Sequence, residues 1–188
     1  MIKTLTSVAA ALLFASAANA ASVVVDAQAD SWNSGAGAGL DTGITLSAGE
    51  SFAVAVAADD LWSAGALPRW SNADGLVGNL LASGTDESGQ AAGTLIGQNF
   101  GQIDGFAFGE LVGPIGNGAF FAVGTNFNGA ANASGVLKLF YWDTFTGDNS
   151  GSVLANIAVV PEPASLALML AGLGIVGGLS RRRGTHRG

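Results

Sequence analysis

The sequence predicts an all-β domain, an antiparallel β-sandwich of jelly-roll type with about seven or eight strands. Two observations lead to this fold class. Short segments in which apolar residues alternate with small or polar ones recur along the chain, and a period of two is typical of strands with one buried face. The 188 residues also include 29 glycines, which break long helices and supply turns between short strands.

The clearest strand signals lie at residues 51–57 and 152–159. In each segment the alternating apolar side chains fall on one face, which predicts that this face is buried. These side chains are Phe52, Val54 and Val56 in the first segment, and Val153, Ala155, Ile157 and Val159 in the second. Further strands are expected at residues 22–27, 44–46, 94–96, 106–108, 119–124 and 136–141. Residues 72–93 are polar and rich in glycine, and they are expected to form a long surface loop.

The N-terminus has the pattern of a secretory signal peptide. Lys3 is followed by an apolar stretch that closes with Ala18-Asn19-Ala20, and small residues at the first and third of these positions suit signal peptidase. We therefore expect a signal peptide with a helical apolar segment at residues 1–20, cleaved between Ala20 and Ala21. The alternative is an N-terminal helix that belongs to the core.

The C-terminus has a second targeting pattern. Pro161-Glu162-Pro163 precedes an uncharged apolar run at residues 164–180, which is followed by Arg181-Arg182-Arg183. A run of 17 residues is just long enough to cross a bilayer as a helix. The arginines are expected to keep residues 181–188 in the cytoplasm as a basic tail. A plain membrane anchor or a buried helix would give a similar pattern.

Residues 159–183 resemble the PEP-CTERM sorting signal of Gram-negative bacteria, on the strength of Pro161-Glu162-Pro163, the apolar run and the arginine cluster. The resemblance implies that the chain is a substrate of an exosortase, a membrane protease. It also implies export, with residues 21–158 as an extracytoplasmic domain that is first held at the inner membrane and then reaches the cell surface or the extracellular matrix. Proteins with this signal are often associated with exopolysaccharide.

Composition excludes several functions for the exported part. Residues 21–160 carry two cations, Arg69 and Lys138, against thirteen carboxylates, a formal net charge of −11. This balance argues against a nucleic-acid partner, because phosphate binding needs lysine and arginine. The chain has no cysteine, and its one histidine, His186, lies in the tail. A Ser-His-Asp or Cys-His centre and a histidine-rich zinc site are therefore excluded from this part. The thirteen acids leave paired carboxylates for glycosidase chemistry as an alternative, but such a number occurs on any acidic domain, and no enzyme is expected.

A candidate calcium site follows the strand at residues 136–141. Asp143 comes directly after this strand, and Asp148 and Asn149 open the last strand after a short loop. Calcium prefers carboxylate, amide and main-chain oxygens, which these residues supply. The alternative is an ordinary turn, because Asp and Asn also bond to their own backbone in turns.

This hairpin, together with the turn that begins at Trp62, resembles the PA-IL-like family of calcium-dependent, galactose-binding bacterial lectins. The resemblance implies that Asp143, Asp148, Asn149 and the main-chain carbonyl of Ala64 bind calcium, and that sugar hydroxyls complete its coordination. Trp62 and Trp70 would then be flanking aromatic residues that contact the ligand; burial in the core is the alternative for both.

The chain also departs from the lectin pattern. The loop after Asp143 is two residues shorter, so Thr144 or Thr146 would have to replace a threonine ligand of the family. The sugar-contacting His-Pro-Asp-Gln stretch of the family has no counterpart in residues 72–93, so sugar specificity is not carried over. The sequence therefore predicts a calcium-assisted carbohydrate-binding module, and the rival is a structural matrix protein without a ligand.

Overall fold

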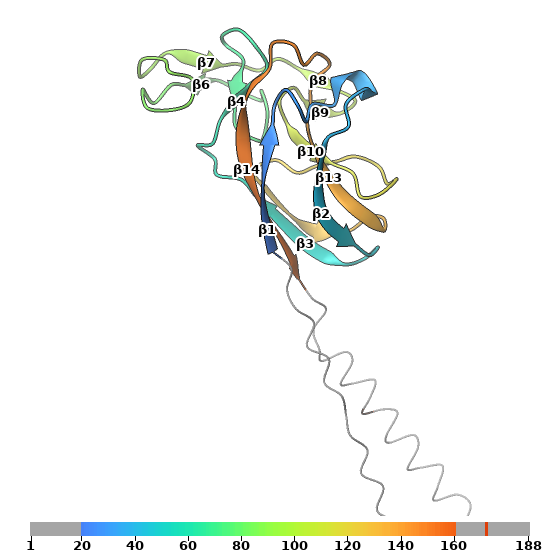
Figure 1. Cartoon of the computed structure of the whole chain (residues 1–188). Helices are drawn as coiled ribbons and strands as arrows, with labels where there is room; N and C mark the ends of the chain where they lie inside the picture. Colours follow the sequence, from blue (N-terminus) through green and yellow to red (C-terminus); the bar gives the residue numbers. More distant parts are fainter. Residues whose placement is uncertain (1–19, 161–171, 173–188) are drawn as a thin grey trace, which may run out of the picture. The chain divides into compact units, whose positions relative to one another are not determined.

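Two antiparallel sheets packed face to face make up most of the fold (Figure 1). The computed structural model describes residues 20–160 and residue 172, and the first of these ranges belongs to one compact unit, Ala18–Val160. The sorting-signal residues Pro161–Pro163 and Arg181–Arg183 lie outside the described residues, as do residues 1–19 of the expected signal peptide. The expected transmembrane helix at residues 164–180 is also outside them, apart from Gly172.

The larger sheet has six strands, with β14 at its centre. One edge of β14 pairs with β1, and its other edge pairs with β3 and β4. The strands of this sheet are β1 (Ala20–Asp26), β3 (Ser51–Ala55), β4 (Trp62–Ser63), β5 (Trp70–Ser71), β12 (Asn126–Ala130) and β14 (Ser150–Val160).

The smaller sheet has four strands in the order β11-β10-β13-β2. They are β2 (Leu40–Leu46), β10 (Leu111–Gly113), β11 (Phe121–Ala122) and β13 (Gly135–Tyr141). Two small hairpins complete the fold, one of β6 (Leu80–Leu81) with β7 (Leu95–Gly97) and one of β8 (Gln102–Ile103) with β9 (Phe106–Ala107). A short 3-10 helix lies at Asn33–Gly35.

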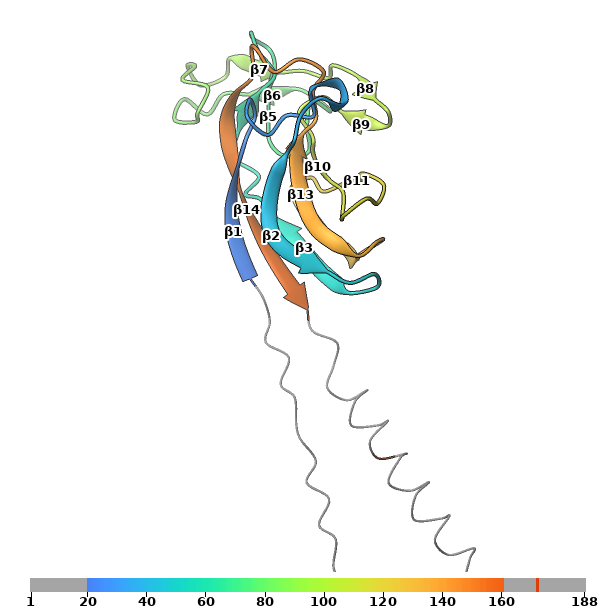
Figure 2. The same ribbon diagram turned by 45° about the vertical axis from the view of Figure 1, so that its right-hand side comes forward.

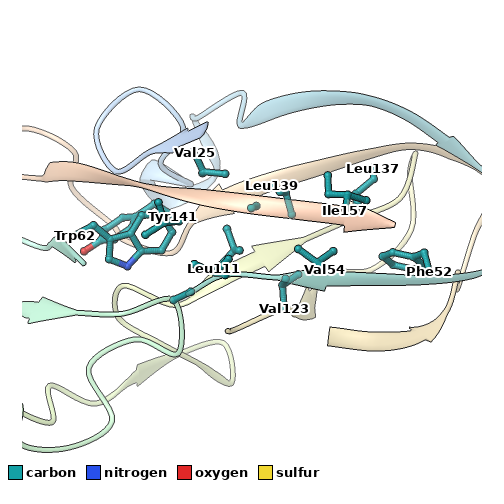
Figure 3. Packing of buried hydrophobic residues seen from close by; sticks show 14 of the residues in the cluster. Val25, Phe52, Val54, Trp62, Leu111, Val123, Leu137, Leu139, Tyr141 and Ile157 are labelled. Atoms are coloured by element: carbon teal, nitrogen blue, oxygen red, sulfur yellow. The ribbon is translucent and has the colours of Figure 1, made fainter. Parts of the chain in front are cut away.

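The core lies between the two sheets (Figure 3). Val54 and Ile157 from the larger sheet pack in one cluster with Leu137 and Leu139 from the smaller sheet. The expected buried faces are confirmed, since Phe52, Val54 and Val56, and likewise Val153, Ala155, Ile157 and Val159, are all buried. Burial of these alternating faces holds the sandwich together, because the removal of apolar surface from water is the main favourable term in folding.

The all-β antiparallel fold class is confirmed, but the expected strand count was too low. The described residues form fourteen strands, and the two main sheets hold six and four of them, where a jelly roll has eight in all. Most of the additional strands, such as β4 and β5, are two or three residues long and therefore have no periodicity to detect. β6 falls inside the expected loop at residues 72–93.

The described residues show neither of the two expected targeting helices. Among them, no helix is both long enough and apolar enough to cross a membrane. Ala20 and Ala21, at the expected cleavage site, are the first two residues of β1, where they pair with Ala158 and Ile157 of β14.

The chain enters and leaves the sandwich at the same end (Figure 2). The antiparallel register causes this, because Ala20 at the start of β1 lies opposite Ala158 near the end of β14. Asp26 lies opposite Ser152 at the other end of the same ladder. The loop that precedes β14, with the candidate calcium ligands, is therefore at the end of the sandwich away from the entry and exit points.

Candidate functional site

Strand pairing brings the two predicted motifs together. β4 pairs with the first residues of β14, with Ser63 opposite Ser150 and Trp62 opposite Gly151. The turn after β4 therefore lies beside the end of the loop that connects β13 with β14. Ala64 from this turn and Asp143, Thr144 and Asp148 from the loop line one pocket of about 180 Å³. Three of the four predicted calcium ligands thus share a pocket, although they come from distant parts of the chain.

Asp143 is a buried carboxylate, only 5% exposed. Its Oδ1 accepts hydrogen bonds from the backbone N–H groups of Thr144 (2.6 Å) and Phe145 (3.3 Å). Burial raises the pKa of Asp143, and the neighbouring charge of Asp148 raises it further, while the hydrogen bonds from Phe145, Thr144 and the Asn149 side chain lower it. The rise prevails, because burial disfavours the charged form of the carboxylate.

Asn149, the fourth predicted ligand, has a buried amide oxygen without a partner. The residue is 6% exposed, and its Nδ2 donates a hydrogen bond of 3.0 Å to the carbonyl oxygen of Ala27. That bond fixes the orientation of the amide. Its Oδ1 then has no hydrogen-bond partner within the described part of the chain. An unpartnered buried oxygen is costly, and a bound cation would satisfy it.

These groups fit a calcium ion. Calcium accepts a mixture of carboxylate, amide and carbonyl oxygens, and Asp143, Asp148, Asn149 and Ala64 supply all three kinds. Residues 20–160 hold no group of three or more His, Cys, Asp or Glu side chains placed to bind a metal. The fit therefore depends on the amide and carbonyl oxygens as much as on the two carboxylates. Thr144 lines the same pocket, whereas the carbonyl of Thr146 accepts the backbone N–H of Asn149.

Arg69 contacts two of the predicted calcium ligands, although the sequence did not single it out as a site residue. Its Nη1 donates a hydrogen bond of 3.4 Å to the carbonyl oxygen of Ala64 and lies 3.8 Å from Oδ2 of Asp148. Its guanidinium carbon lies 4.4 Å from the centre of the Phe100 ring, which is a cation–π contact. A positive charge of the chain itself therefore already faces two of the predicted calcium ligands.

The two predicted ligand-contacting tryptophans are not at the pocket. Trp62 is 0% exposed, and its Nε1 donates hydrogen bonds to the carbonyl oxygens of Asn72 (3.1 Å) and Gly109 (3.0 Å). Its ring meets Tyr141 edge-on in the core (Figure 3), so it offers no face to a sugar. Trp70 is half-buried and packs against a second apolar cluster that includes Leu61 and Ile96.

Two phenylalanines take the place expected for the tryptophans. Phe145 is 62% exposed and Phe100 is 46% exposed, and both line the pocket with Asp143 and Asp148. Phe145 lies between the two aspartates in the sequence, which was a usable signal. Phe100 lies far from them along the chain, and no local pattern marks it.

Gly65 controls how closely the turn approaches the loop. Its φ is +116°, and a Cβ at this position would overlap the Asp148 carboxylate. Asp148 can therefore lie against the turn only because this residue has no side chain.

Gly65→Ala should destabilise the protein by about 1–3 kcal/mol, because it adds both backbone strain and a clash. It should also weaken calcium binding, because Asp148 is pushed away from Ala64. Gly43→Ala is the matched control, with a φ of +70° and open space around the added Cβ. Urea unfolding and calcium titration of both variants test this, and equal effects of the two substitutions would contradict the role of the Asp148 contact.

The comparisons with known proteins agree with the sorting signal. Residues 159–183 match the PEP-CTERM protein-sorting motif, which confirms the expected recognition signal and indicates export and exosortase-mediated sorting. No curated protein matches the chain.

Among solved structures, the chain is similar to one described as "EclA N-terminal domain; PllA-like lectin". The identity is 21%, the TM-score is 0.49, and the match covers 74% of this chain and 95% of the other.

Proposed function

We propose that the chain is an exported, exosortase-sorted protein whose β-sandwich is a calcium-assisted carbohydrate-binding module that acts at the cell surface or in an exopolysaccharide matrix. The observation that carries the proposal is the pocket between the turn after β4 and the loop that precedes β14. Buried Asp143, Asp148 and the Ala64 carbonyl lie there beside two exposed aromatic rings, Phe100 and Phe145. Oxygen ligands for a cation next to exposed aromatic faces suit a sugar, which has hydroxyls at its edges and an apolar face.

The predicted ligands and the two aromatic rings have separate parts in this function. The side chains of Asp143, Asp148 and Asn149, with the Ala64 carbonyl, would hold calcium, which when bound supplies a charge that sugar hydroxyls can coordinate. Phe145 and Phe100 would cover the apolar face of the sugar ring. The backbone N–H groups of Thr144 and Phe145 keep the Asp143 carboxylate oriented. The proposed activity is binding without catalysis.

A calcium titration of the full-length chain, followed by melting temperature, tests the proposal. All four tryptophans lie within residues 20–160, so intrinsic fluorescence reports unfolding of the sandwich. A ligand that binds only the folded state raises its stability by about 2.7 kcal/mol at a hundredfold excess over Kd. A glycan array with and without calcium then tests sugar binding. No thermal shift and a blank array would leave the structural matrix protein as the better description.

Phe145→Ala should weaken sugar binding by about 1 kcal/mol, which is about fivefold, while the calcium affinity and the stability stay almost unchanged. The reason is that this ring is exposed and lies beside the proposed cation ligands without being one of them. Titration calorimetry with calcium and with an array-positive sugar measures both quantities. Leu154→Ala, which removes an exposed apolar side chain from β14, is the control. An unchanged sugar affinity in Phe145→Ala would remove this ring from the binding surface.

A further inference from the structure

The side chain of Arg69 lies against oxygens that a bound calcium ion would need. Its Nη1 approaches the Ala64 carbonyl oxygen at 3.4 Å and Asp148 Oδ2 at 3.8 Å. This is the sole ion pair within residues 20–160. Lys138, the other cation of this part, donates to the carbonyl oxygen of Ala38. The positive charge at the pocket is therefore provided by one residue.

Backbone hydrogen bonds hold the main chain of Arg69, whereas its side chain is partly exposed. The carbonyl oxygen of Arg69 accepts hydrogen bonds from the Ala64 N–H (2.9 Å) and the Ser63 hydroxyl (3.3 Å). The side chain is partly exposed, and its flat face rests on Phe100, which in turn meets Phe108 edge-on. A long, partly exposed ion pair of this kind contributes little to stability, so its loss costs the fold little.

Arg69 and calcium compete for the same oxygens. Calcium binds oxygen at about 2.3–2.6 Å, so an ion held by Ala64 and Asp148 would lie close to the guanidinium. Like charges at such separations repel each other strongly at the edge of a protein. The two cations are therefore expected to exclude each other from these oxygens.

We propose that Arg69 is a tethered cation that occupies part of the calcium site in the metal-free protein and leaves it when calcium binds. The inference rests on the proposed function and adds a residue that sets the calcium concentration at which the site fills. With Arg69 in place, Asp148 is partly neutralised without metal, and the site fills only at higher calcium concentrations. In the metal-free protein the guanidinium also contacts the Phe100 ring, which supports it beside the pocket.

Calcium titration calorimetry on the full-length chain tests this inference with three variants. Arg69→Gln should bind calcium about tenfold more tightly than the unaltered protein, an effect of ordinary size for two coupled ligands. Arg69→Lys keeps the charge and should stay close to the unaltered affinity. Lys138→Gln removes the same charge away from the pocket and should change little, which controls for net charge.

A second measurement follows the side chain itself. The Nε–H signal of Arg69 in an NMR spectrum, assigned by its loss in Arg69→Gln, should shift as calcium is added. This reading does not depend on how the substitutions affect stability.

The outcomes separate the inference from the proposed function. Equal calcium affinities for Arg69→Gln and Lys138→Gln, with an unmoved Arg69 signal, would overturn the inference and leave the calcium site standing. Absence of calcium binding in every variant would overturn both. Binding that appears only in Arg69→Gln would support the tethered cation and would show that the unaltered site is closed to calcium.

Discussion

Asp143→Asn should abolish the calcium-dependent rise in melting temperature while the metal-free protein remains folded. Asparagine keeps an oxygen that can accept the Thr144 and Phe145 N–H groups, but it removes the charge that calcium needs. The free energy of unfolding of the unaltered protein should rise by about 2.7 kcal/mol at a hundredfold excess of calcium over Kd, and that of the variant should not rise. The measurement is thermal unfolding with and without calcium.

The pH dependence of the stability of the metal-free protein gives a second test of the same substitution. Burial raises the pKa of Asp143 above its ordinary value of 3.8. The group therefore favours the folded state most below pH 3.8, and this contribution is lost as pH rises through the higher folded-state pKa. At neutral pH the ionised carboxylate disfavours the metal-free fold.

Without calcium, Asp143→Asn should thus be at least as stable as the unaltered protein at pH 7, and the loss of stability with rising pH should be smaller. Urea unfolding at several pH values from about 3 to 7 measures both. Asp59→Asn, at an exposed loop position, is the control. A calcium response that persists in Asp143→Asn would remove this residue from the site.

Trp62→Ala should lower the free energy of unfolding by about 3–5 kcal/mol, the range for loss of a large buried aromatic side chain. The substitution leaves a cavity beside Tyr141 and deprives the carbonyl oxygens of Asn72 and Gly109 of the indole N–H. Urea unfolding followed by circular dichroism measures the loss.

Trp70→Ala is the comparison for Trp62→Ala. Trp70 is only half-buried, so its removal should lower the free energy of unfolding clearly less. If Trp62 instead stacked on a sugar, its removal would weaken sugar binding at almost unchanged stability. A stable Trp62→Ala variant with impaired sugar binding is therefore the result that would contradict its place in the core.

The long strands were predictable from the sequence, because each has one buried face. The alternation in residues 51–57 and 152–159 reports this burial directly, and the structure confirms both faces. Strands such as β4 and β5 were not predictable, since two residues are too few to show an alternation. β4 also pairs with β14, which is distant in sequence, and such a pairing leaves no local pattern.

The residues of the candidate site also divide into those that the sequence could indicate and those that it could not. Asp143 and Asp148 were found because turn and strand signals lie next to oxygen ligands in the sequence, and Ala64 was found through the resemblance of its turn to the lectin pattern. The structure places all three in one pocket. Arg69 and Phe100 were missed, because their relation to the pocket exists only after β4 pairs with β14. The two tryptophans were assigned to the ligand through the resemblance to the lectin family, and Trp62 is buried in the core instead.

The position of the pocket along β14 has a consequence for how the protein is displayed. The pocket precedes Ser150, whereas the chain leaves the sandwich at Val160, and eleven extended residues span about 35 Å. A domain tethered through its C-terminal side would therefore carry the pocket at its distal end. Capture of a glycan would then need no release from the tether, and both the anchored and the liberated forms would be competent to bind.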